Sequence, residues 1–572
     1  MAFAHSFLLA TQLASLVGVY AIPPASSALT QQAWDNLSAA VQGKLFQGVP
    51  LASPCFGFGR TNEKTCSSLK AQYTNETFRS QNFGAYINTQ WESCQTTSAQ
   101  CLLDSADPTN PLPTTPPRKC GLGSVPSHHI DVRSANDVAA AFTFSKQTGV
   151  PLVIKNTGHD YKGRSSGPDA LALWMHNLKD MSYHPDFVAD GCSATEPAVT
   201  LGAGVQWADA YQFADAHNIT LVGGSDRSVG AVGGWLQGGG HSILSNSMGL
   251  GVDRVLQFKV VTPDGVSRVA NACQNEDLFF ALRGGGGGTF GVVLEATMLA
   301  SPAVELQAVI LSWGTDNTTL TAEMWRIMAD NALAWATEGW GGLAQSNVAI
   351  FVNPTIGAAQ AALSMAPLIN FGRKLQQSGV EGASTTVTTF PTFLSFYDTF
   401  TLQHVASVGT SLAIASRLVN KANFATPAAR TALVSSMLAT NAAAGRGMIV
   451  LIVAPFAYSN NTRTNTSVTP AWRSSVYHVT AVAPWAWNAT GVEKRAGYAA
   501  AGEAVDSLRQ ITPDAAYQNE ADVYEPNHEV AFWGTNYPAL LKIKLKYDPD
   551  HLLDCWHCVG WNPKSPRFSC YL

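Results

Sequence analysis

The chain has 572 residues, a net charge of −5 and 13% charged residues, against about 25% in ordinary soluble domains. A chain of this length can bury more than one core. It carries no basic blocks, which argues against nucleic acid as a partner. After the N-terminus, no apolar run approaches the ~20 residues that a membrane helix needs, so no membrane partner is expected either.

The first 21 residues predict a cleaved signal peptide. An apolar stretch starts at Phe7 and runs, with interruptions, to Ala21, and Val19-Tyr20-Ala21 offers small residues at plausible cleavage positions. The segment before this stretch carries only the α-amino group and His5 as possible positive charges, which is weak for a signal peptide. A short buried helix is the alternative interpretation. Seven glycosylation sequons agree with secretion, although Asn218 lies in an apolar stretch where it could be buried. The sequons are at Asn36, Asn75, Asn218, Asn317, Asn460, Asn465 and Asn488. We expect a secreted, N-glycosylated monomer.

Ten cysteines, an even number, suggest disulfides in an exported chain. Cys55 with Cys66, and Cys94 with Cys101, would close short loops, but the spacing does not fix the pairing. The segment Cys555-Trp556-His557-Cys558 could indicate a redox or zinc site. Because it has no second CxxC and no strand-to-helix context, a structural role is favoured. No metal site is expected.

Residues 22–120 form an N-terminal extension rich in cysteine and proline, irregular except for a helical pattern around 30–45. It ends in the proline-rich stretch 107–117, where we place a domain boundary.

Residues 121–302 have an α+β pattern rather than a regular alternation of strands and helices. Ser134, with Asp137 three residues later, predicts the start of a helix that Gly149 ends. Further expected elements are a strand at 151–155, a hairpin of 256–262 and 266–270, a short helix at 277–283 and a strand at 292–298.

Residues 303–510 differ in character, because the glycine clusters disappear. Helical stretches alternate there with apolar runs such as 349–352 and 448–454, which indicates a separate substrate-facing domain. Towards the C-terminus, Lys542, Lys544 and Lys546 alternate with apolar residues as on a strand. We interpret them as a solvated strand edge or a support for the first domain.

The most informative segment is Val153-Ile154-Lys155-Asn156-Thr157-Gly158-His159-Asp160-Tyr161-Lys162-Gly163. A strand-like run stops there in a small-residue loop with one histidine. Successive backbone N–H groups in such a loop can cradle a diphosphate, and the histidine could attack an electrophilic cofactor carbon. Taken alone, the segment is better explained as a loop histidine beside a turn glycine.

Other blocks accompany this loop. They are the run from Ser228 to Ser242, five glycines at Gly284–Gly288 followed by Thr289-Phe290-Gly291-Val292-Val293, and the C-terminal segments Tyr517–Asp522, Trp533–Tyr537 and Ile543–Pro549. The glycines do not fit the G-x-G-x-x-G frame of a Rossmann fold.

Together these blocks resemble the flavin oxidoreductases of the vanillyl-alcohol oxidase superfamily, and the C-terminal blocks resemble its berberine-bridge-enzyme-like branch. The resemblance covers roughly residues 115–565. It implies an α+β fold with a two-part, PCMH-type FAD-binding domain at 121–302 and a substrate domain at 303–510 with an antiparallel sheet flanked by helices. It also implies a C-terminal segment, 511–565, that returns to the FAD domain.

His159 matches the family position that is joined to the 8α-methyl carbon of FAD, although noncovalent binding is the alternative. Many relatives have a second link from a cysteine before the glycine block. Here that region reads Gly223-Gly224-Ser225-Asp226-Arg227-Ser228, so a single link is expected. The resemblance assigns further cofactor contacts to Asn156, Thr157, Gly158, Asp160, Gly163, Val229, Gly230, Gly233, Gly234, Gly239, Gly240, Ser242, Gly291, Val293 and Asn536.

Two residues are candidates for the catalytic base. Carbohydrate-oxidising relatives carry Tyr-x-Asn-Tyr and use the second tyrosine, whereas this chain has Tyr517-Gln518-Asn519-Glu520. A partly buried Glu520 could act as general base, with Tyr517 as its rival. Alternatively, Glu520 only orients a neighbour or pairs with Arg or Lys.

The sequence is similar to fungal secreted isoamyl-alcohol-oxidase-like proteins. This implies oxidation of a small alcohol or a related C–H substrate, with hydride transfer to flavin N5 and O2 as the expected acceptor, giving H2O2. A dehydrogenase with another electron acceptor, a secondary-metabolite tailoring oxidase and a non-catalytic flavin- or ligand-binding glycoprotein are the alternatives.

Overall fold

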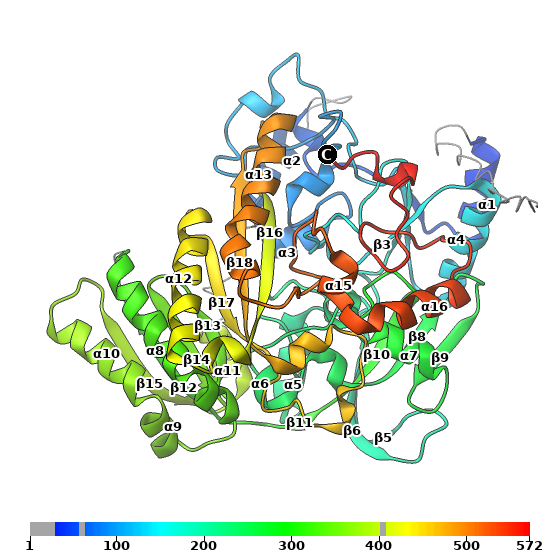
Figure 1. The fold of residues 1–572 in the computed structure, drawn as a ribbon. Helices are drawn as coiled ribbons and strands as arrows, with labels where there is room; N and C mark the ends of the chain where they lie inside the picture. Colours follow the sequence, from blue (N-terminus) through cyan, green and yellow to red (C-terminus); the bar gives the residue numbers. More distant parts are fainter. Residues whose placement is uncertain (1–28, 57–62, 315, 401–407) are drawn as a thin grey trace, which may run out of the picture.

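The computed structural model describes residues 29–56, 63–314, 316–400 and 408–572. The expected signal peptide lies outside the described residues. Three sheets carry the described architecture, and the C-terminal helices lie beside the second of them (Figure 1). This is the mixed α+β fold that the sequence predicts.

The first sheet supports the histidine loop. Its order is β1-β2-β4-β3, with the last three strands parallel and β1 antiparallel. Helix α4 connects β2 to β3. Ser134 and Asp137 form a capping box at its start, and Gly149 ends it with a φ of 73°, so both expected signals are confirmed. The bounds are β1 (Leu45–Gln47), β2 (His128–Asp131), α4 (Ala135–Thr148), β3 (Leu152–Lys155) and β4 (Leu171–Trp174).

The second sheet has five antiparallel strands in the order β5-β6-β10-β8-β9. The expected hairpin is present as β8 and β9, and the expected short helix is α7. The elements of this region are β5 (Met181–Val188), β6 (Thr195–Gly202), α5 (Trp207–Ala216), β7 (Ile219–Thr220), α6 (Ser245–Met248), β8 (Val255–Val261), β9 (Ser267–Asn271), α7 (Glu276–Leu282), β10 (Val292–Leu299) and β11 (Ser301–Pro302).

The third sheet is large and antiparallel, in the order β15-β12-β14-β13-β17-β18-β16. Successive side chains of a strand alternate between its faces. One face packs on α8, α10, α12 and α13, which form a helical layer beside it (Figure 1). The bounds are β12 (Leu306–Ser312), α8 (Thr318–Thr337), β13 (Gly341–Ala344), β14 (Val348–Asn353), α9 (Ala358–Ser364), α10 (Ala366–Gln377), β15 (Ser384–Phe390), α11 (Phe393–Phe400), β16 (Ser411–Asn420), α12 (Pro427–Ala443), β17 (Met448–Ile452), β18 (Ser475–Trp485), α13 (Gly491–Ala504) and α14 (Asp506–Arg509).

The C-terminal segment returns to the second sheet through α15 (His528–Trp533) and α16 (Tyr537–Tyr547), which lies beside α7 (Figure 1). Lys546 and Tyr547 both bond to the carboxylate of Asp277. The expected strand at 542–546 is therefore wrong. Alternation over five residues is too short to separate a strand from a helix, and Pro538 at the first turn favours the helix.

The N-terminal extension is more helical than expected, with α1 (Gln31–Ala40), α2 (Glu63–Gln72) and α3 (Glu76–Ser80). All ten cysteines form disulfides. Cys55–Cys66 is present, but Cys94 pairs with Cys570 and Cys101 with Cys120, so the short pairing Cys94–Cys101 is wrong. The chain end lies against the extension, where Gln95 N–H also donates to the Cys570 carbonyl, and this tertiary contact has no local sequence signal. The other two bonds are Cys192–Cys273 and Cys555–Cys558.

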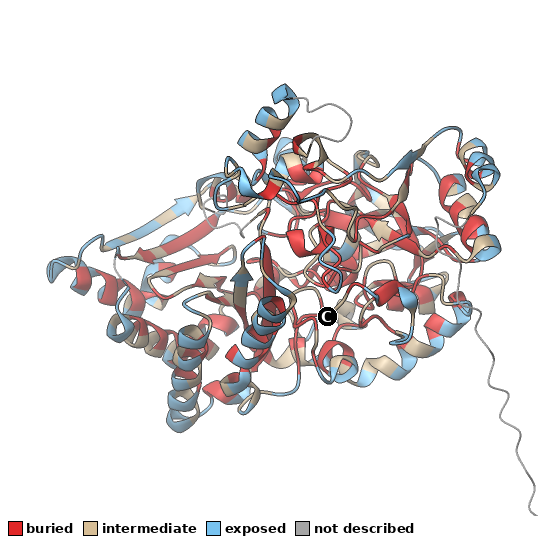
Figure 2. Cartoon of the chain, turned by 90° about the horizontal axis from the view of Figure 1, so that it is seen from above, coloured by how far each residue is buried: buried red, intermediate tan, exposed pale blue. Residues whose placement is uncertain are grey.

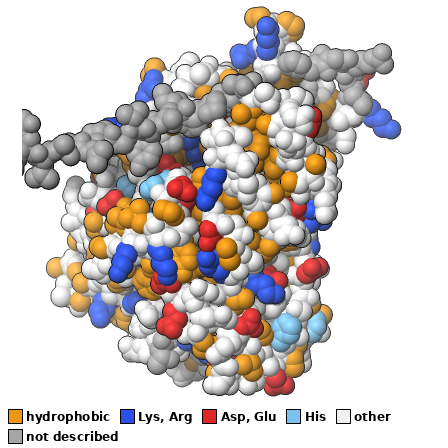
Figure 3. All heavy atoms as spheres, turned by 90° about the vertical axis from the view of Figure 1, so that its right-hand side faces the viewer, with side chains coloured by type: hydrophobic (Ala, Val, Ile, Leu, Met, Phe, Trp, Pro, Cys, Tyr) orange, Lys and Arg blue, Asp and Glu red, His pale blue; other side chains and the backbone are white. Residues whose placement is uncertain are grey.

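Buried residues run through the sheets and the inner faces of the helices, whereas the outer helix faces are exposed (Figure 2). On the face in Figure 3, basic and acidic side chains are interspersed. All seven sequon asparagines are exposed, including Asn218. Within the described residues, no helix is both long enough and apolar enough for a membrane span.

Candidate flavin site and active site

A cavity of about 640 Å3 lies between the loops of the first two sheets and the free face of the third. Its two sides differ in construction. We call the first the loop wall, made by lining residues within 156–165, 224–241, 287–293 and 517–520. We call the second the sheet wall, made by Leu343, Ile350, Leu412, Ile414, Ile449, Leu451, Thr480 and Val482.

The histidine loop begins where β3 ends, at the buried Lys155. Its ammonium donates hydrogen bonds to the carbonyls of Phe83 and Ala85, at 2.6 and 2.8 Å, and thereby ties the loop to the N-terminal extension. Burial lowers the pKa of Lys155 to about 7. Gly158 has a φ of +92°, a conformation that favours glycine. The loop can therefore turn sharply directly after a rigid strand.

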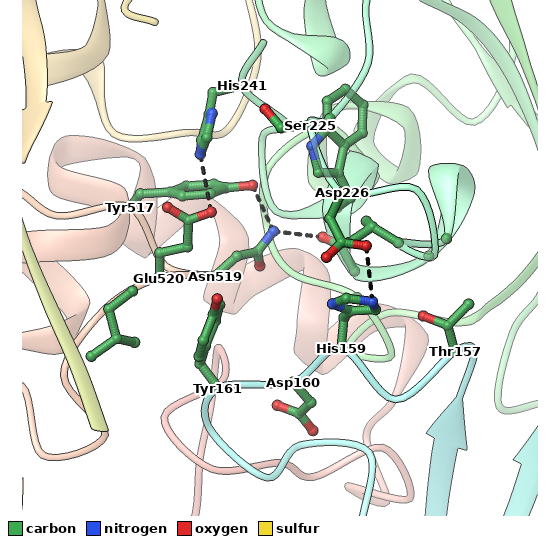
Figure 4. Close-up of a pocket in the computed structure, with 18 of the residues that line it drawn as sticks. Thr157, His159, Asp160, Tyr161, Ser225, Asp226, His241, Tyr517, Asn519 and Glu520 are labelled. Atoms are coloured by element: carbon green, nitrogen blue, oxygen red, sulfur yellow. Dashed lines mark hydrogen bonds and ion pairs between the residues drawn. The ribbon is translucent and has the colours of Figure 1, made fainter. Parts of the chain in front are cut away.

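His159 is held by its Nε2 atom, which lies 2.6 Å from Ser228 Oγ and 3.5 Å from Asp226 Oδ1. Burial lowers the pKa of His159, while the Asp226 carboxylate opposes this shift. The ring is therefore neutral at physiological pH. With Nε2 engaged, Nδ1 is the nitrogen available for a bond to a cofactor (Figure 4).

The same loop offers a cradle for an anion. Among the described residues, no protein acceptor binds the backbone N–H groups of Gly158, His159 and Asp160. The Asp160 carboxylate accepts hydrogen bonds from the N–H groups of Lys162 and Ser165, at 3.0 and 2.7 Å, which fixes the loop. Free, oriented N–H groups of this kind suit a diphosphate.

The glycine block supplies the facing surface. A Cβ at Gly230 or Gly233 would come within 2.6 or 2.7 Å of the Asn156 amide. A Cβ at Gly234 would meet no protein atom within 4 Å, and Gly234 lines the cavity. The first two glycines are thus needed for packing, and the third leaves room for a flat group to approach the backbone.

Because every cysteine is in a disulfide, no thiol is available for a second flavin link. Asp226 stands in the segment where relatives with two links have a cysteine, and it contacts His159 instead. The cradle and the open glycine fit a bound FAD. Cys555 and Cys558 are bonded to each other, so they do not present the free thiolates that a zinc site needs.

At the other end of the cavity, Glu520 lies between two imidazoles. Its Oε1 is 3.0 Å from His241 Nε2, and its Oε2 is 2.9 Å from His478 Nε2. Burial alone raises the pKa of Glu520, but the two histidines outweigh it and hold this pKa well below its usual value. Figure 4 shows His241 and Glu520 at this end and His159 at the other, with Tyr161 pointing between them.

Tyr517 also lines this end. Its phenol oxygen accepts a hydrogen bond from Gly240 N–H at 3.2 Å and lies 2.7 Å from the Asn519 amide nitrogen. Burial, reinforced by the Glu520 charge, raises the pKa of Tyr517 well above its usual value. The phenol is therefore protonated at neutral pH.

Most of the residues singled out from the sequence meet at this cavity. Five of the expected cofactor contacts do not line it. Gly163 packs under Trp91, Gly239 and Gly240 lie behind the wall, Ser242 closes a turn onto Ser245, and Asn536 donates a hydrogen bond to the Val468 carbonyl. The residues that do line it are Asn156, Thr157, Gly158, His159, Asp160, Val229, Gly230, Gly233, Gly234, Gly291, Val293, Tyr517 and Glu520.

Sequence reasoning missed several residues at the site, namely Tyr161, Asp226, His241 and His478. His241 directly follows three glycines of a recognised block, which could have drawn attention to it. Its partner Glu520 lies 279 residues away in the chain. His478 lies on β18, in an apolar run that carries no recognisable motif.

Comparison with known proteins agrees with this geometry. Residues 126–271 match the FAD binding domain family, and residues 516–555 match the berberine and berberine-like family. The chain is 38% identical to the FAD-linked oxidoreductase ffsJ of Aspergillus flavipes, over 95% of this chain and 94% of that protein. It is also 38% identical to the FAD-linked oxidoreductase cheF of Chaetomium globosum, over 96% and 90% of the two chains.

The crystal structure of the VAO-type flavoprotein MtVAO615 from Myceliophthora thermophila C1 has a similar fold. It superposes with a TM-score of 0.82 at 29% identity, over 94% of this chain and 97% of that one. The glycine-lined cradle, the two family matches and the full-length relatives lead to one conclusion. The chain belongs to the FAD-linked oxidoreductases of the vanillyl-alcohol oxidase and berberine-bridge-enzyme-like family.

Proposed function

We propose that the protein binds FAD through a single covalent link at His159 and oxidises an apolar alcohol to a carbonyl compound. The observation that carries this proposal is one continuous cavity with a cofactor cradle at His159 and a cluster of titratable groups around Glu520. When bound, FAD accepts a hydride from the substrate carbon at its N5 atom and passes the electrons to O2, which leaves as H2O2.

The chain's own residues have three tasks in this reaction. The N–H groups of Gly158, His159 and Asp160 would hold the diphosphate. Ser228 and Asp226 would keep the imidazole of His159 turned so that Nδ1 meets the 8α carbon. The groups around Glu520 would accept the proton of the substrate hydroxyl, since an alcohol loses this proton as the hydride leaves.

The sheet wall supports an apolar substrate. The side chains of this wall are aliphatic except for Thr480, and Phe396 and Phe400 line the cavity as well, while the polar Gln345 and Arg446 line it outside the strands. A sugar would need several hydrogen-bond partners at such a wall, because polar groups left unpaired on binding cost free energy. Aliphatic alcohols are the first candidate class, and a larger apolar secondary metabolite is the second.

Secretion and glycosylation are also proposals. Five disulfides are typical of proteins made in an oxidising compartment, and all seven sequon asparagines are accessible. Secretion also gives a reason for a covalent cofactor, because a dissociated flavin would be lost outside the cell. We expect a monomer.

The test has two parts. Acid-denatured protein should give a flavin-fluorescent polypeptide band, and His159→Ala should lose it, while the exposed His217→Ala should retain it. Flavin released entirely to the supernatant by the wild type would refute the covalent link.

The second part is anaerobic mixing with 3-methyl-1-butanol, 1-octanol, cinnamyl alcohol, glucose and cellobiose. We expect 1-octanol or cinnamyl alcohol to bleach the flavin band fastest. No bleaching by any probe would favour a non-catalytic flavin- or ligand-binding glycoprotein. Bleaching followed by slow reoxidation in air and fast reoxidation by a quinone would favour a dehydrogenase.

A further inference from the structure

We propose that His241 is the catalytic base, that Glu520 orients it, and that His478 positions Glu520. This inference rests on the proposed function and assigns its proton acceptor. It replaces Glu520 and Tyr517, the two candidates from the sequence, with a residue that neither composition nor motif singled out.

The two imidazoles differ in access. His241 lines the cavity, with 13% of its side chain exposed, whereas the side chain of His478 is fully buried. Both ring Nε2 atoms contact the Glu520 carboxylate. The Nδ1 of His478 is enclosed without a partner, but the Nδ1 of His241 is not enclosed. Only His241 therefore presents a free lone pair to a substrate.

The register of the third sheet places His478, and neighbouring aromatic rings close it off. On β18, His478 pairs with Leu451 of β17 and Leu418 of β16, so its side chain lies on the same face as the sheet wall. Trp472 and Tyr517 pack against the ring, with centroids 5.7 Å away in both cases. His478 is thus fixed in place behind Glu520 as a hydrogen-bond donor.

The geometry makes the other two candidates poor bases. The two histidines favour the ionised form of Glu520, and its pKa is accordingly low, so the carboxylate has little tendency to keep a transferred proton. Tyr517 holds its proton, because burial and the nearby Glu520 charge raise its pKa. A neutral imidazole hydrogen-bonded to a carboxylate is instead oriented for proton uptake, and the carboxylate stabilises the imidazolium that forms.

The O–H bond of the alcohol breaks and its proton goes to His241 Nδ1, while the C–H bond breaks and its hydride goes to flavin N5. The alcohol loses two electrons and becomes a carbonyl compound, and FAD gains them. The titratable groups that face His241 are Glu520, His478, Tyr517 and, across the cavity, Tyr161.

The same three groups could alternatively hold a metal ion, since their ligand atoms lie within 4.8 Å of one another. Elemental analysis of the purified holoenzyme separates the two possibilities without an activity assay. We expect zinc, iron and copper far below one per chain. A stoichiometric metal that His241→Gln removes would overturn the proposal.

The kinetic test measures anaerobic flavin reduction by 1-octanol or cinnamyl alcohol, whichever reduces the wild type faster. General-base catalysis contributes about 10²–10⁴-fold, so His241→Gln should slow reduction by about that factor and abolish the acidic limb of the pH profile. Its flavin absorption spectrum and covalent FAD content should be unchanged. His217→Gln, the same substitution at an exposed site, should behave as the wild type.

Variants of Glu520 and His478 should differ from His241→Gln in their kinetics. Glu520→Gln removes the charge that stabilises the imidazolium and should slow reduction while the acidic limb remains. His478→Phe removes the donor to Glu520 and should slow reduction, and His478→Gln, which restores a donor, should rescue it.

Failure of the proposal differs from failure of the proposed function. If no probe reduces the wild type, the function itself is wrong, and the role of His241 with it. If the wild type is reduced and His241→Gln is reduced equally fast, only the base assignment is wrong. Loss of the acidic limb in Glu520→Gln alone would return the role to Glu520, and a stalled Tyr517→Phe with a normal His241→Gln would assign it to Tyr517.

Discussion

The loop wall and the sheet wall enclose the same cavity by different means. The loop wall uses backbone: Gly158 adopts a left-handed φ, Gly234 leaves open space, and the N–H groups of Gly158, His159 and Asp160 bind no protein acceptor among the described residues. The sheet wall uses side chains from alternate positions of antiparallel strands. A wall made of backbone tolerates few substitutions, whereas an aliphatic wall keeps its character under many. The loop wall can thus specify a cofactor, and the sheet wall can adapt to a substrate.

The largest effect is expected where one methyl group enters the loop wall. Gly234→Ala places a Cβ in the cavity without touching protein. Overpacking costs about 1–3 kcal/mol, so FAD incorporation should fall by about 5- to 150-fold while the thermal stability of the FAD-free protein is unchanged. Flavin absorbance per chain and the melting temperature measure the two quantities.

Gly357→Ala is the matched control, since a Cβ there also meets no atom within 4 Å but points to solvent. Normal FAD content in Gly234→Ala would mean that FAD does not approach the backbone at Gly234 and that the glycine block serves packing only.

This contrast also explains what the sequence could predict. The helix capped by Ser134 and the loop around His159 follow from local rules, namely a capping box and a strand that ends in glycine. His478 could not be found this way, because its role arises from the register of β18 against β16 and β17. The bond between Cys94 and Cys570 and the burial of Lys544 in α16 likewise depend on contacts made only in the folded chain.

A smaller effect is expected on the sheet wall. Leu451→Ala removes three carbons from a cavity-lining side chain, and burial of each carbon contributes about 0.8 kcal/mol. The ratio kcat/KM for 1-octanol should therefore fall by about 50-fold, with unchanged FAD content. Leu545→Ala, at an exposed position of α16, is the control. An unchanged ratio would show that the substrate does not contact this face of the third sheet.

The smallest effect at neutral pH is expected from the acid stability beneath the loop wall, which changes only below about pH 6.5. His129 of β2 is buried and stacks on Phe83, with ring centroids 3.7 Å apart. Burial, reinforced by the Lys155 charge, lowers its pKa from 6.5 to about 4. Between these two pH values the unfolded chain binds a proton that the folded chain does not, so stability falls as the pH falls from 6.5 to 4. His129→Phe removes this group and should flatten that decline by at most about 3.5 kcal/mol, at about 1.4 kcal/mol per pKa unit. Melting temperatures across this window, with His217→Phe as the exposed control, measure the difference. An equally steep decline in both variants would mean that the acid sensitivity arises from other groups and that the first sheet is not the acid-labile support of the histidine loop.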